Sequence, residues 1–208
     1  IGNAPNAFAI ESFIDEIAFA TGKNPLALRL ELARGAPRMQ ALLRAVAQMS
    51  SWESPRAGRG LGIAAIEKDD SLAAAVAEVS IDKGNGGIKV HNFWAAVDAG
   101  IAVQPRNIMA QTEGSIVWGL GHVLREEITI RGGRAVQSNF HDYQVTRMVD
   151  VPNIETRVMS TDNPPTGIGD CGVAFVAPAV ANALFALTGK RLRELPFSAE
   201  KVVGALRA

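Results

Sequence analysis

The order of apolar patterns along the chain constrains its fold more than any other feature of the sequence. Residues 6–49 place apolar side chains at three- and four-residue intervals, whereas residues 60–98 hold short apolar runs of strand length. The last two of these runs are separated by Lys83-Gly84-Asn85-Gly86-Gly87, and Asn and Gly tolerate the positive φ that tight turns require. Helices followed by strands predict an α+β fold with helices packed on antiparallel strands, and not an alternating βαβ repeat.

Capping and turn residues set the limits of the other expected elements. Arg131-Gly132-Gly133-Arg134 indicates a second hairpin, and residues 154–161 indicate a further strand. The whole chain is expected to be part of one domain, with a helical segment over about 1–55 and an α+β segment over about 56–208. Helices are expected over about 6–20, 25–35, 37–49, 105–124, 176–187 and 198–207.

Composition and charge exclude several classes of partner. Hydrophobic residues make up 48% of the 208 residues, which is enough to bury a substantial core. Lys plus Arg (21) equals Asp plus Glu (21), so no net positive charge attracts nucleic acid. No uninterrupted apolar run approaches membrane-spanning length, and we expect no membrane segment in this chain. The single cysteine forms no internal disulfide and leaves the compartment open between cytoplasm and periplasm.

The stretch PPTGIGDCGV, residues 164–173, concentrates chemical groups just before an apolar helix. Gly167, Gly169 and Gly172 flank Asp170, so we expect unusual φ and ψ values there and close approach by a bulky group. The carboxylate is placed to act as a general base, to lie beside a bound anion or to bind a metal. The alternative is that it only caps the N-terminus of the following helix. Cys171 is either a reactive thiol or an inert apolar side chain.

Two further clusters are candidates for binding. Small and polar residues recur at three- and four-residue intervals over 104–121 and are expected to form one helix face for a flat or phosphate-bearing ligand: Gln111, Gly114, Ser115, Trp118 and Gly121. Close helix packing explains the glycines equally well but explains the Gln less well. In the loop 139–143, His141 is expected to be hydrogen-bonded within the loop and not to bind a metal. The sequence holds no G-x-S-x-G, H-E-x-x-H, P-loop or paired-cysteine motif.

An ordered set of segments resembles the C-terminal part of the molybdenum-binding subunit of the xanthine dehydrogenase family. The resemblance is greatest to the beta subunits of isoquinoline 1-oxidoreductase and aldehyde dehydrogenase, and it covers nearly the whole chain. It implies the C-terminal half of a molybdenum-cofactor-binding domain. The segments are NAFAIESFIDEIA (6–18), KNPLALRL (23–30), VDAGIAVQPRNIMAQTEGSIVWGL (97–120), EITIRGGRAVQSNFHDYQVTRM (127–148) and PPTGIGDCGVAFVAPAVANALFALTGKRLRELPF (164–197).

The resemblance implies a molybdenum hydroxylase that oxidises an aldehyde or an N-heteroaromatic substrate with oxygen derived from water. The implied cofactor is molybdopterin with molybdenum, in its cytosine dinucleotide form, shared with upstream segments that this sequence lacks. A carboxylate takes the proton of the metal-bound hydroxyl, and electrons pass to iron–sulfur clusters on a separate subunit. The implied partners are the remainder of the molybdenum-binding subunit, the iron–sulfur subunit and the small-molecule substrate.

Asp170 stands at the position of the family's catalytic glutamate. One methylene fewer draws the carboxylate back by roughly 1.5 Å, and a misplacement of about 1 Å can lower a rate on the order of 100-fold. The residues that match cofactor contacts of the family are Gln111, Gly114, Gly167, Gly169 and Asn3.

The absent upstream segments lead us to expect that the chain is inactive without the rest of the molybdenum-binding subunit. The chain begins with Ile1 and not Met, which indicates a processed, split or excised product. The alternative function is a catalytically inactive or truncated module of the same fold with a binding or assembly role. The substitution Asp170→Glu distinguishes the two, because it should raise turnover only where the site works.

Overall fold

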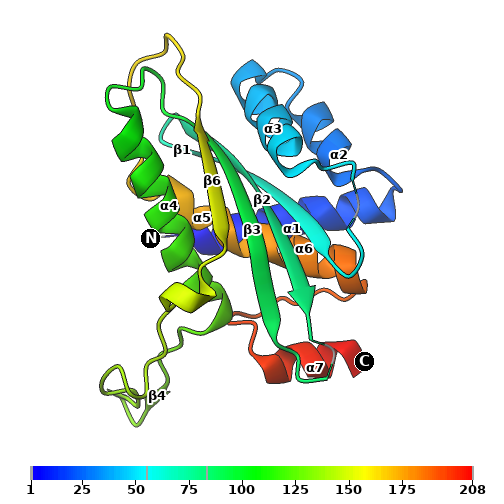
Figure 1. The fold of residues 1–208 in the computed structure, drawn as a ribbon, viewed down its shortest axis with the longest axis vertical. Helices are drawn as coiled ribbons and strands as arrows, with labels where there is room; N and C mark the ends of the chain where they lie inside the picture. The colour runs from blue at the N-terminus through cyan, green and yellow to red at the C-terminus, as the bar shows by residue number, and fades with distance from the viewer. Residues whose placement is uncertain (1, 55, 83, 208) are drawn as a thin grey trace.

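The computed structural model describes residues 2–54, 56–82 and 84–207 (Figure 1). Ile1, Pro55, Lys83 and Ala208 lie outside the described residues, so the first residue of the expected 83–87 turn is among them. The predicted helices and hairpins are confirmed, with small differences at their ends.

The helices are α1 (Asn3–Ala20), α2 (Pro25–Leu32), α3 (Pro37–Ser50), α4 (Pro105–Leu124), α5 (Cys171–Ala174), α6 (Val176–Thr188) and α7 (Ala199–Arg207). A short 3-10 helix, η1, covers Met148–Asp150. The strands are β1 (Gly60–Lys68), β2 (Ser71–Ile81), β3 (Ile88–Asp98), β4 (Ile130–Arg131), β5 (Arg134–Ala135) and β6 (Asn153–Val158).

The main sheet has the strand order β1-β2-β3-β6 and is mixed. β1, β2 and β3 pair antiparallel, but β6 pairs parallel with β3, with Phe93 opposite Ile154. The expectation of antiparallel strands is therefore wrong for β6. The physical reason is the long connection between β3 and β6, which contains α4 and crosses over to bring the chain back in the same direction.

Two tight turns join the antiparallel strands. Between β2 and β3, Gly86 has a φ of +76° and Asp82 N–H donates to the carbonyl of Gly87 at 2.9 Å, as the hairpin signal predicted. Between β1 and β2, Asp69 and Asp70 have φ values of 50° and 63°. This second turn carries no glycine, and the sequence analysis did not identify it.

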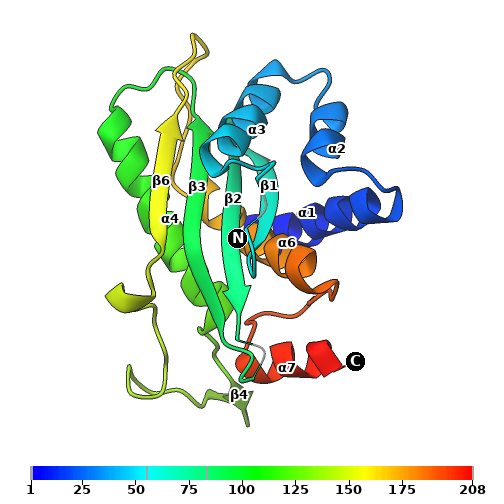
Figure 2. The same cartoon turned by 45° about the vertical axis from the view of Figure 1, so that its right-hand side comes forward.

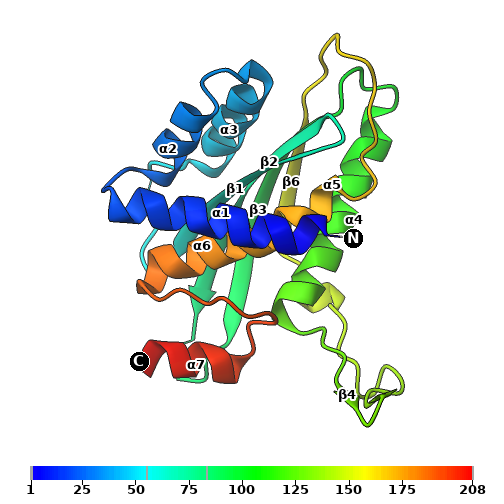
Figure 3. The same ribbon diagram turned by 180° about the vertical axis from the view of Figure 1, so that it is seen from behind.

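Helices cover both faces of the sheet (Figures 2 and 3). α3, with α2 beside it, packs on one face, where Leu42 and Val46 contact Trp94 and its neighbours. α4, α5 and α6 pack on the other face, and α1 lies across α6. α6 can approach β1 closely because Gly60 and Gly62 have no side chain. A Cβ on either glycine would collide with the backbone of α6.

One stretch of the chain departs from the expectation that no apolar run reaches membrane-spanning length. Cys171–Thr188 is 18 residues long with a mean hydropathy of 1.8, which is long and apolar enough by length and composition alone. In this fold 72% of it is buried, mainly against β1 and β2, as in the core helix of a folded domain. The placement of α6 in the core accounts for its composition.

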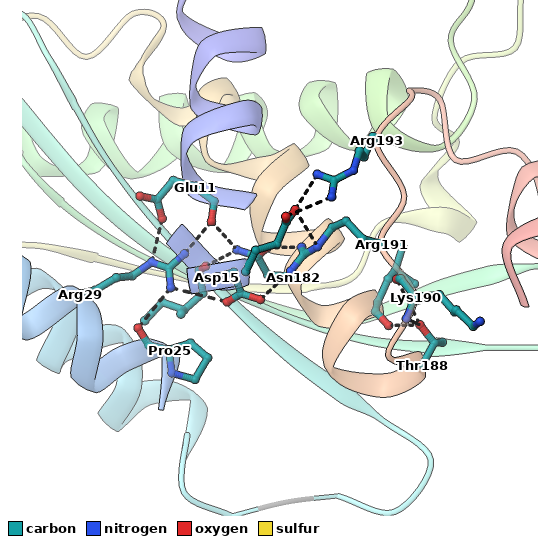
Figure 4. Close-up of polar contacts among 12 residues, drawn as sticks. Glu11, Asp15, Pro25, Arg29, Asn182, Thr188, Lys190, Arg191 and Arg193 are labelled. Atoms are coloured by element: carbon teal, nitrogen blue, oxygen red, sulfur yellow. Dashed lines mark hydrogen bonds and ion pairs between the residues drawn. The ribbon is translucent and has the colours of Figure 1, made fainter. Parts of the chain in front are cut away.

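A buried ionic network ties α1 to α2 and to the segment after α6 (Figure 4). Arg29 of α2 donates to Glu11 at 2.8 Å and lies 3.6 Å from Asp15, both on α1. Arg191 contacts the other oxygen of Asp15 at 3.0 Å. Burial raises the pKa of Asp15 and lowers the pKa of Arg191, and the opposite charges work against both shifts.

Backbone groups of the sheet and of α1 are drawn into the same network. The N–H of Ala65 on β1 donates to the Glu11 carboxylate at 3.0 Å. Asn182 of α6 donates to the carbonyls of Glu11 and Ile63, at 3.3 and 2.9 Å, and accepts from Arg191 at 2.7 Å. The network therefore sets the position of α1 relative to both α6 and β1.

Arg29→Met is expected to destabilise the fold by about 3–5 kcal/mol, because it leaves two buried carboxylates without their shared cation. The measurement is the free energy of unfolding from urea denaturation. Lys23→Met is the matched control, since it removes an ion pair with Glu31 whose side chains are 44% and 47% exposed. An equal loss of stability in both variants would contradict the role of the network.

Candidate functional site

A cavity of about 460 Å³ lies between the start of α4 and the loop that carries Asp170. Asn107 and Gln111 line it from α4, Gln104 lines it from the N-cap position of that helix, and Thr166 and Gly169 line it from the loop. Their three- and four-residue spacing places the three carboxamides on one side of the helix. None of the residues that line the cavity is charged. Of these amides only Gln111 was predicted from the sequence, although the spacing of all three was a usable signal.

Three elements hold the loop. Gln111 Nε2 of α4 donates to the carbonyl of Gly169 at 2.7 Å. Ser71, fully buried at the start of β2, donates to the carbonyl of Gly167 at 2.6 Å and lies 2.6 Å from the hydroxyl of Thr166. The N–H of Thr166 donates to the carbonyl of Ala99, just after β3, at 2.9 Å. The loop is therefore anchored to both the helix and the sheet.

A second set of contacts fixes the chain at the end of β3. Asp98 accepts from Arg38 at 2.8 Å through both oxygens, from the N–H of Gly100 at 2.9 Å and from Thr161 at 3.2 Å. Burial would raise the pKa of Asp98, but the hydrogen bonds from Arg38 and Gly100 hold it below its usual value. Gly100 has a φ of +74° and touches the backbone at Pro164, so a side chain there would displace the loop.

Asp170 occupies the N-cap position of α5, but its side chain makes no capping hydrogen bond. Within the described residues its side chain makes no hydrogen bond and no ion pair, and the residue is half-buried. The charge of Asp170 contributes to the raised pKa of Lys68, which is due chiefly to a hydrogen bond from Lys68 to Asp69. The Asp170 carboxylate therefore does not cap α5, which was the alternative interpretation of this residue.

The glycines around Asp170 serve two different purposes. Gly167, Gly169 and Gly172 all have φ outside the left-handed region, whereas Asp170, with φ of −124° and ψ of 2°, lies outside both the helical and the extended regions. A Cβ on Gly172 would lie 2.5 Å from the Cβ of Ser115, which makes this glycine a packing requirement between α5 and α4. Cβ atoms on Gly167 and Gly169 would meet nothing within 4 Å, because both residues border open space.

Gly172→Ala is expected to destabilise the fold by roughly 1–3 kcal/mol through overpacking against α4, whereas Gly169→Ala should leave the free energy of unfolding nearly unchanged. Urea denaturation of both variants measures the difference. Equal stability of the two variants would show that α5 and α4 do not pack as described.

The expected small, polar face of α4 is divided in the structure. Ser115 is buried against Gly172 of α5, so the helix-packing interpretation is right for this position. Gly121 packs instead against the side chain of Glu126, which follows the end of α4. Gly114 borders open space on the exposed side of the helix, and Trp118 is 60% exposed. Of the five residues, Gln111 alone lines the cavity, because the other side chains point toward the core or away from the loop.

Asn3 lies in the first turn of α1, at the end of the helix that approaches α4 and α5 (Figure 3). Its Nδ2 atom is buried and has no hydrogen-bond partner among the described residues. Asn3 does not line the 460 Å³ cavity. Its amide is a donor available to a group that approaches this end of α1.

The loop 139–143 is held by its own hydrogen bonds. Asp142 accepts from the N–H groups of Asn139 and Ser138 at 2.9 and 3.0 Å, and these bonds lower its pKa. The side chain of His141 is 73% exposed. In the part of the chain that the structure describes, no group of three or more His, Cys, Asp or Glu side chains is arranged to hold a metal ion.

Cys171 is expected to be unreactive in the native protein. Its side chain is 1% exposed, and burial, with a smaller effect of Asp170, raises the pKa of its thiol to about 12. A thiol-specific disulfide reagent at mildly alkaline pH should leave the native chain unmodified and label one thiol after unfolding in urea. Rapid labelling of the native chain would contradict this burial.

Comparison with known proteins identifies the family. The family described as "Molybdopterin cofactor-binding domain" matches residues 39–152. The chain is 38% identical to the beta subunit of isoquinoline 1-oxidoreductase from Brevundimonas diminuta, over 94% of this chain and 26% of that protein. It is 31% identical to a subunit of the nicotinate dehydrogenase from Pseudomonas putida, over 97% of this chain and 18% of that protein.

The fold is shared with a solved enzyme. The aldehyde oxidoreductase from Desulfovibrio desulfuricans superposes with a TM-score of 0.80 at 15% identity, over 97% of this chain and 40% of that one. The chain thus spans about a quarter or less of the length of the two curated relatives described above. It belongs to the molybdopterin cofactor-binding domain family and corresponds to part of the molybdenum-binding subunit of the xanthine dehydrogenase family.

Proposed function

We propose that this chain supplies the catalytic carboxylate and one wall of the cofactor site in a molybdenum hydroxylase that oxidises an aldehyde or an N-heteroaromatic compound. The observation that carries the proposal is the unpartnered carboxylate of Asp170, next to Gly169 at the edge of the amide-lined cavity. The names of two relatives, isoquinoline 1-oxidoreductase and nicotinate dehydrogenase, support an N-heteroaromatic substrate.

The residues of the cavity fit a molybdopterin. Gln104, Asn107 and Gln111 each offer N–H donors and a carbonyl acceptor, which match the donor and acceptor edge of a pterin or of a cytosine base. The cavity has the volume of a small-molecule site. Gly167 and Gly169 leave open space where side chains would otherwise stand, so a bulky group can approach their backbone.

The same residues define which parts of the chain would hold the cofactor. Gln111 and Gly169 would contact it in the cavity. Gly167 would leave room for it on the open side of the loop, Gly114 would let it lie against the next turn of α4, and Asn3 would donate from α1. Bound molybdopterin supplies molybdenum, which takes up the electrons that the substrate loses. The cytosine dinucleotide form is part of this proposal and is supported by the three amides in a wall that is otherwise mainly apolar.

Asp170 would accept a proton at its carboxylate. Because no side chain of the described chain donates to it, its oxygens are available to a group in the cavity. Asp170 is shorter by one methylene than the family's glutamate, so its reach depends on the position of the loop. The contacts of Gln111 and Ser71 hold the loop backbone and so set the distance of the carboxylate from the substrate.

Other chains would complete the enzyme. The remainder of the molybdenum-binding subunit would close the open side of the cavity, since the chain spans 26% of its relative from Brevundimonas diminuta. Iron–sulfur clusters would lie on a separate subunit, because a single cysteine cannot supply the thiolates of a cluster. The chain is therefore proposed to be inactive without these partners.

Asp170→Ala in the assembled enzyme is expected to lower turnover by about 100-fold or more, because it removes the proton acceptor. Asp170→Glu is expected to raise turnover, because it restores the reach of the family's base. Asp162→Asn is the matched control, since it removes an exposed carboxylate from the same connection. The molybdenum content of each variant is measured alongside turnover and should stay at the wild-type level.

Wild-type turnover in Asp170→Ala, at an unchanged molybdenum content, would contradict the role of Asp170. An assembled protein that holds no molybdenum and turns over no substrate in any variant would support the alternative, a catalytically inactive module with a binding or assembly role.

A further inference from the structure

The polarity of α1 is inverted relative to that of a surface helix. A helix on the surface of a domain normally buries its apolar side chains and turns its charged ones to water. The five buried residues of α1 are all small or polar: Ala7, Glu11, Ser12, Asp15 and Ala18. Its large apolar side chains lie on the other side, where Ile10 is 58%, Phe13 60% and Ile17 36% exposed. α1 therefore exposes to water the kind of side chain that a helix usually buries.

The exposed apolar residues of α1 form one stripe. Ile10, Phe13 and Ile17 follow one another at intervals of three and four residues, so they share one side of the helix. Figure 3 shows α1 as the outer layer on this side of the molecule, in front of α6. α1 cannot turn the stripe inward, because the buried ionic network holds its opposite side against α2 and against the segment after α6.

The stripe continues into an apolar groove of about 240 Å³ beside β1, the edge strand of the sheet. Ile14, which neighbours both Ile10 and Ile17 on α1, lines this groove. α2 and α3 supply further lining residues, among them Met39 and Leu32, which is 64% exposed. The stripe and the groove make up one surface, the α1 face, whose largest apolar residues are Ile10, Phe13, Ile14, Ile17, Leu32 and Met39.

Polar groups lie at the margin of the α1 face. Glu16, three residues after Phe13, bonds to Arg193 at 2.6 Å, and Glu67 of β1 is an exposed acid that borders the groove. An apolar centre with a polar margin is typical of the interface between two protein surfaces. The α1 face therefore has the composition of a protein-binding surface.

The lengths of the relatives indicate which protein covers this face. The aldehyde oxidoreductase from Desulfovibrio desulfuricans has the same fold over 97% of this chain, which corresponds to only 40% of its own chain. For the beta subunit of isoquinoline 1-oxidoreductase the matched share is 26%. A helix with buried charges on one side and large apolar side chains on the other is suited to lie between two layers of a larger folded unit.

We infer that the α1 face is the contact surface for the remainder of the molybdenum-binding subunit. The inference rests on the function proposed above, because that function supplies the partner, and it goes further by naming the surface. The α1 face shares no lining residue with the cavity beside Asp170, so contact here is distinct from closure of that cavity. Removal of Ile10, Phe13 and Ile17 from water stabilises the assembly.

The first experiment places a photo-crosslinking benzophenone analogue of phenylalanine at position 13 of the tagged chain in its native organism. Irradiation of the assembled enzyme should join this position to peptides of the molybdenum-binding subunit that lie outside the present sequence, which mass spectrometry identifies. Position 19 is the matched control, because Phe19 is 72% exposed but lies on another side of α1 and already packs on Phe185, with 5.2 Å between ring centroids. Cross-links from position 13 to a second copy of the chain, to any other protein or to nothing overturn the inference.

The second experiment coexpresses the chain with the remainder of the subunit as a separate polypeptide and measures how much of it copurifies. Phe13→Asp is expected to lower this amount at least about tenfold, because it places a charge in an apolar contact. Phe19→Asp is the matched control and should copurify like the wild type. Urea denaturation of the isolated chain should show the same stability for Phe13→Asp as for the wild type, since this side chain is exposed. Wild-type copurification of Phe13→Asp, or an equal loss in Phe19→Asp, overturns the inference.

Both experiments measure association and depend on neither molybdenum nor turnover. Loss of association in Phe13→Asp together with wild-type turnover in Asp170→Ala would support the α1 face and contradict the catalytic role of Asp170. Full association in Phe13→Asp together with lost turnover in Asp170→Ala would do the reverse. The two proposals therefore fail separately.

Discussion

The rest of the structure depends on the buried charges of Glu11 and Asp15. A carboxylate removed from water must be paired, so α1 can adopt only the position in which Arg29 and Arg191 meet its inner face. The Glu11 carboxylate also accepts from the N–H of Ala65 on β1, and Asn182 donates to backbone carbonyls of both α1 and β1. Because these contacts are directional, they set the orientation of α1 more closely than its apolar side chains do, several of which are exposed. They thereby direct the first turn of α1, with the unpartnered amide of Asn3, toward α4 and α5.

The position of the candidate catalytic carboxylate is likewise a property of several elements at once. Asp170 itself contacts nothing that would fix it, but the loop before it is held by Gln111 at Gly169 and by the buried hydroxyl of Ser71 at Gly167. Gly172, two residues later, allows α5 to pack closely against α4. A short Asp side chain on a loop fixed at both ends has a defined reach, and this reach decides whether the shorter acid can replace the family's glutamate.

The two ends of α4 offer different chemistry. The cavity at its start is lined by uncharged residues, three of them amides, whereas the cavity at its end is lined by charged residues that include Lys89, Arg125 and Asp150. One helix therefore borders two cavities of different chemistry, and the motifs indicated only the one at its start. Since no residue lines both cavities, substitutions can probe each without disturbing the other.

The sequence by itself determined the elements whose signals are local: the periodicity of α1, α3 and α4, the cap at Asn24, the turn at Gly86 and the order of helices before strands. It also located Asp170 and Gln111 through resemblance to a known family. Only the tertiary structure decided that β6 runs parallel to β3 and that Gly172 is a packing residue. The anchor at Ser71 shows the physical reason, because it joins positions 95 and 96 residues apart. A contact of that kind arises when separate layers pack together, and no spacing along the chain records it.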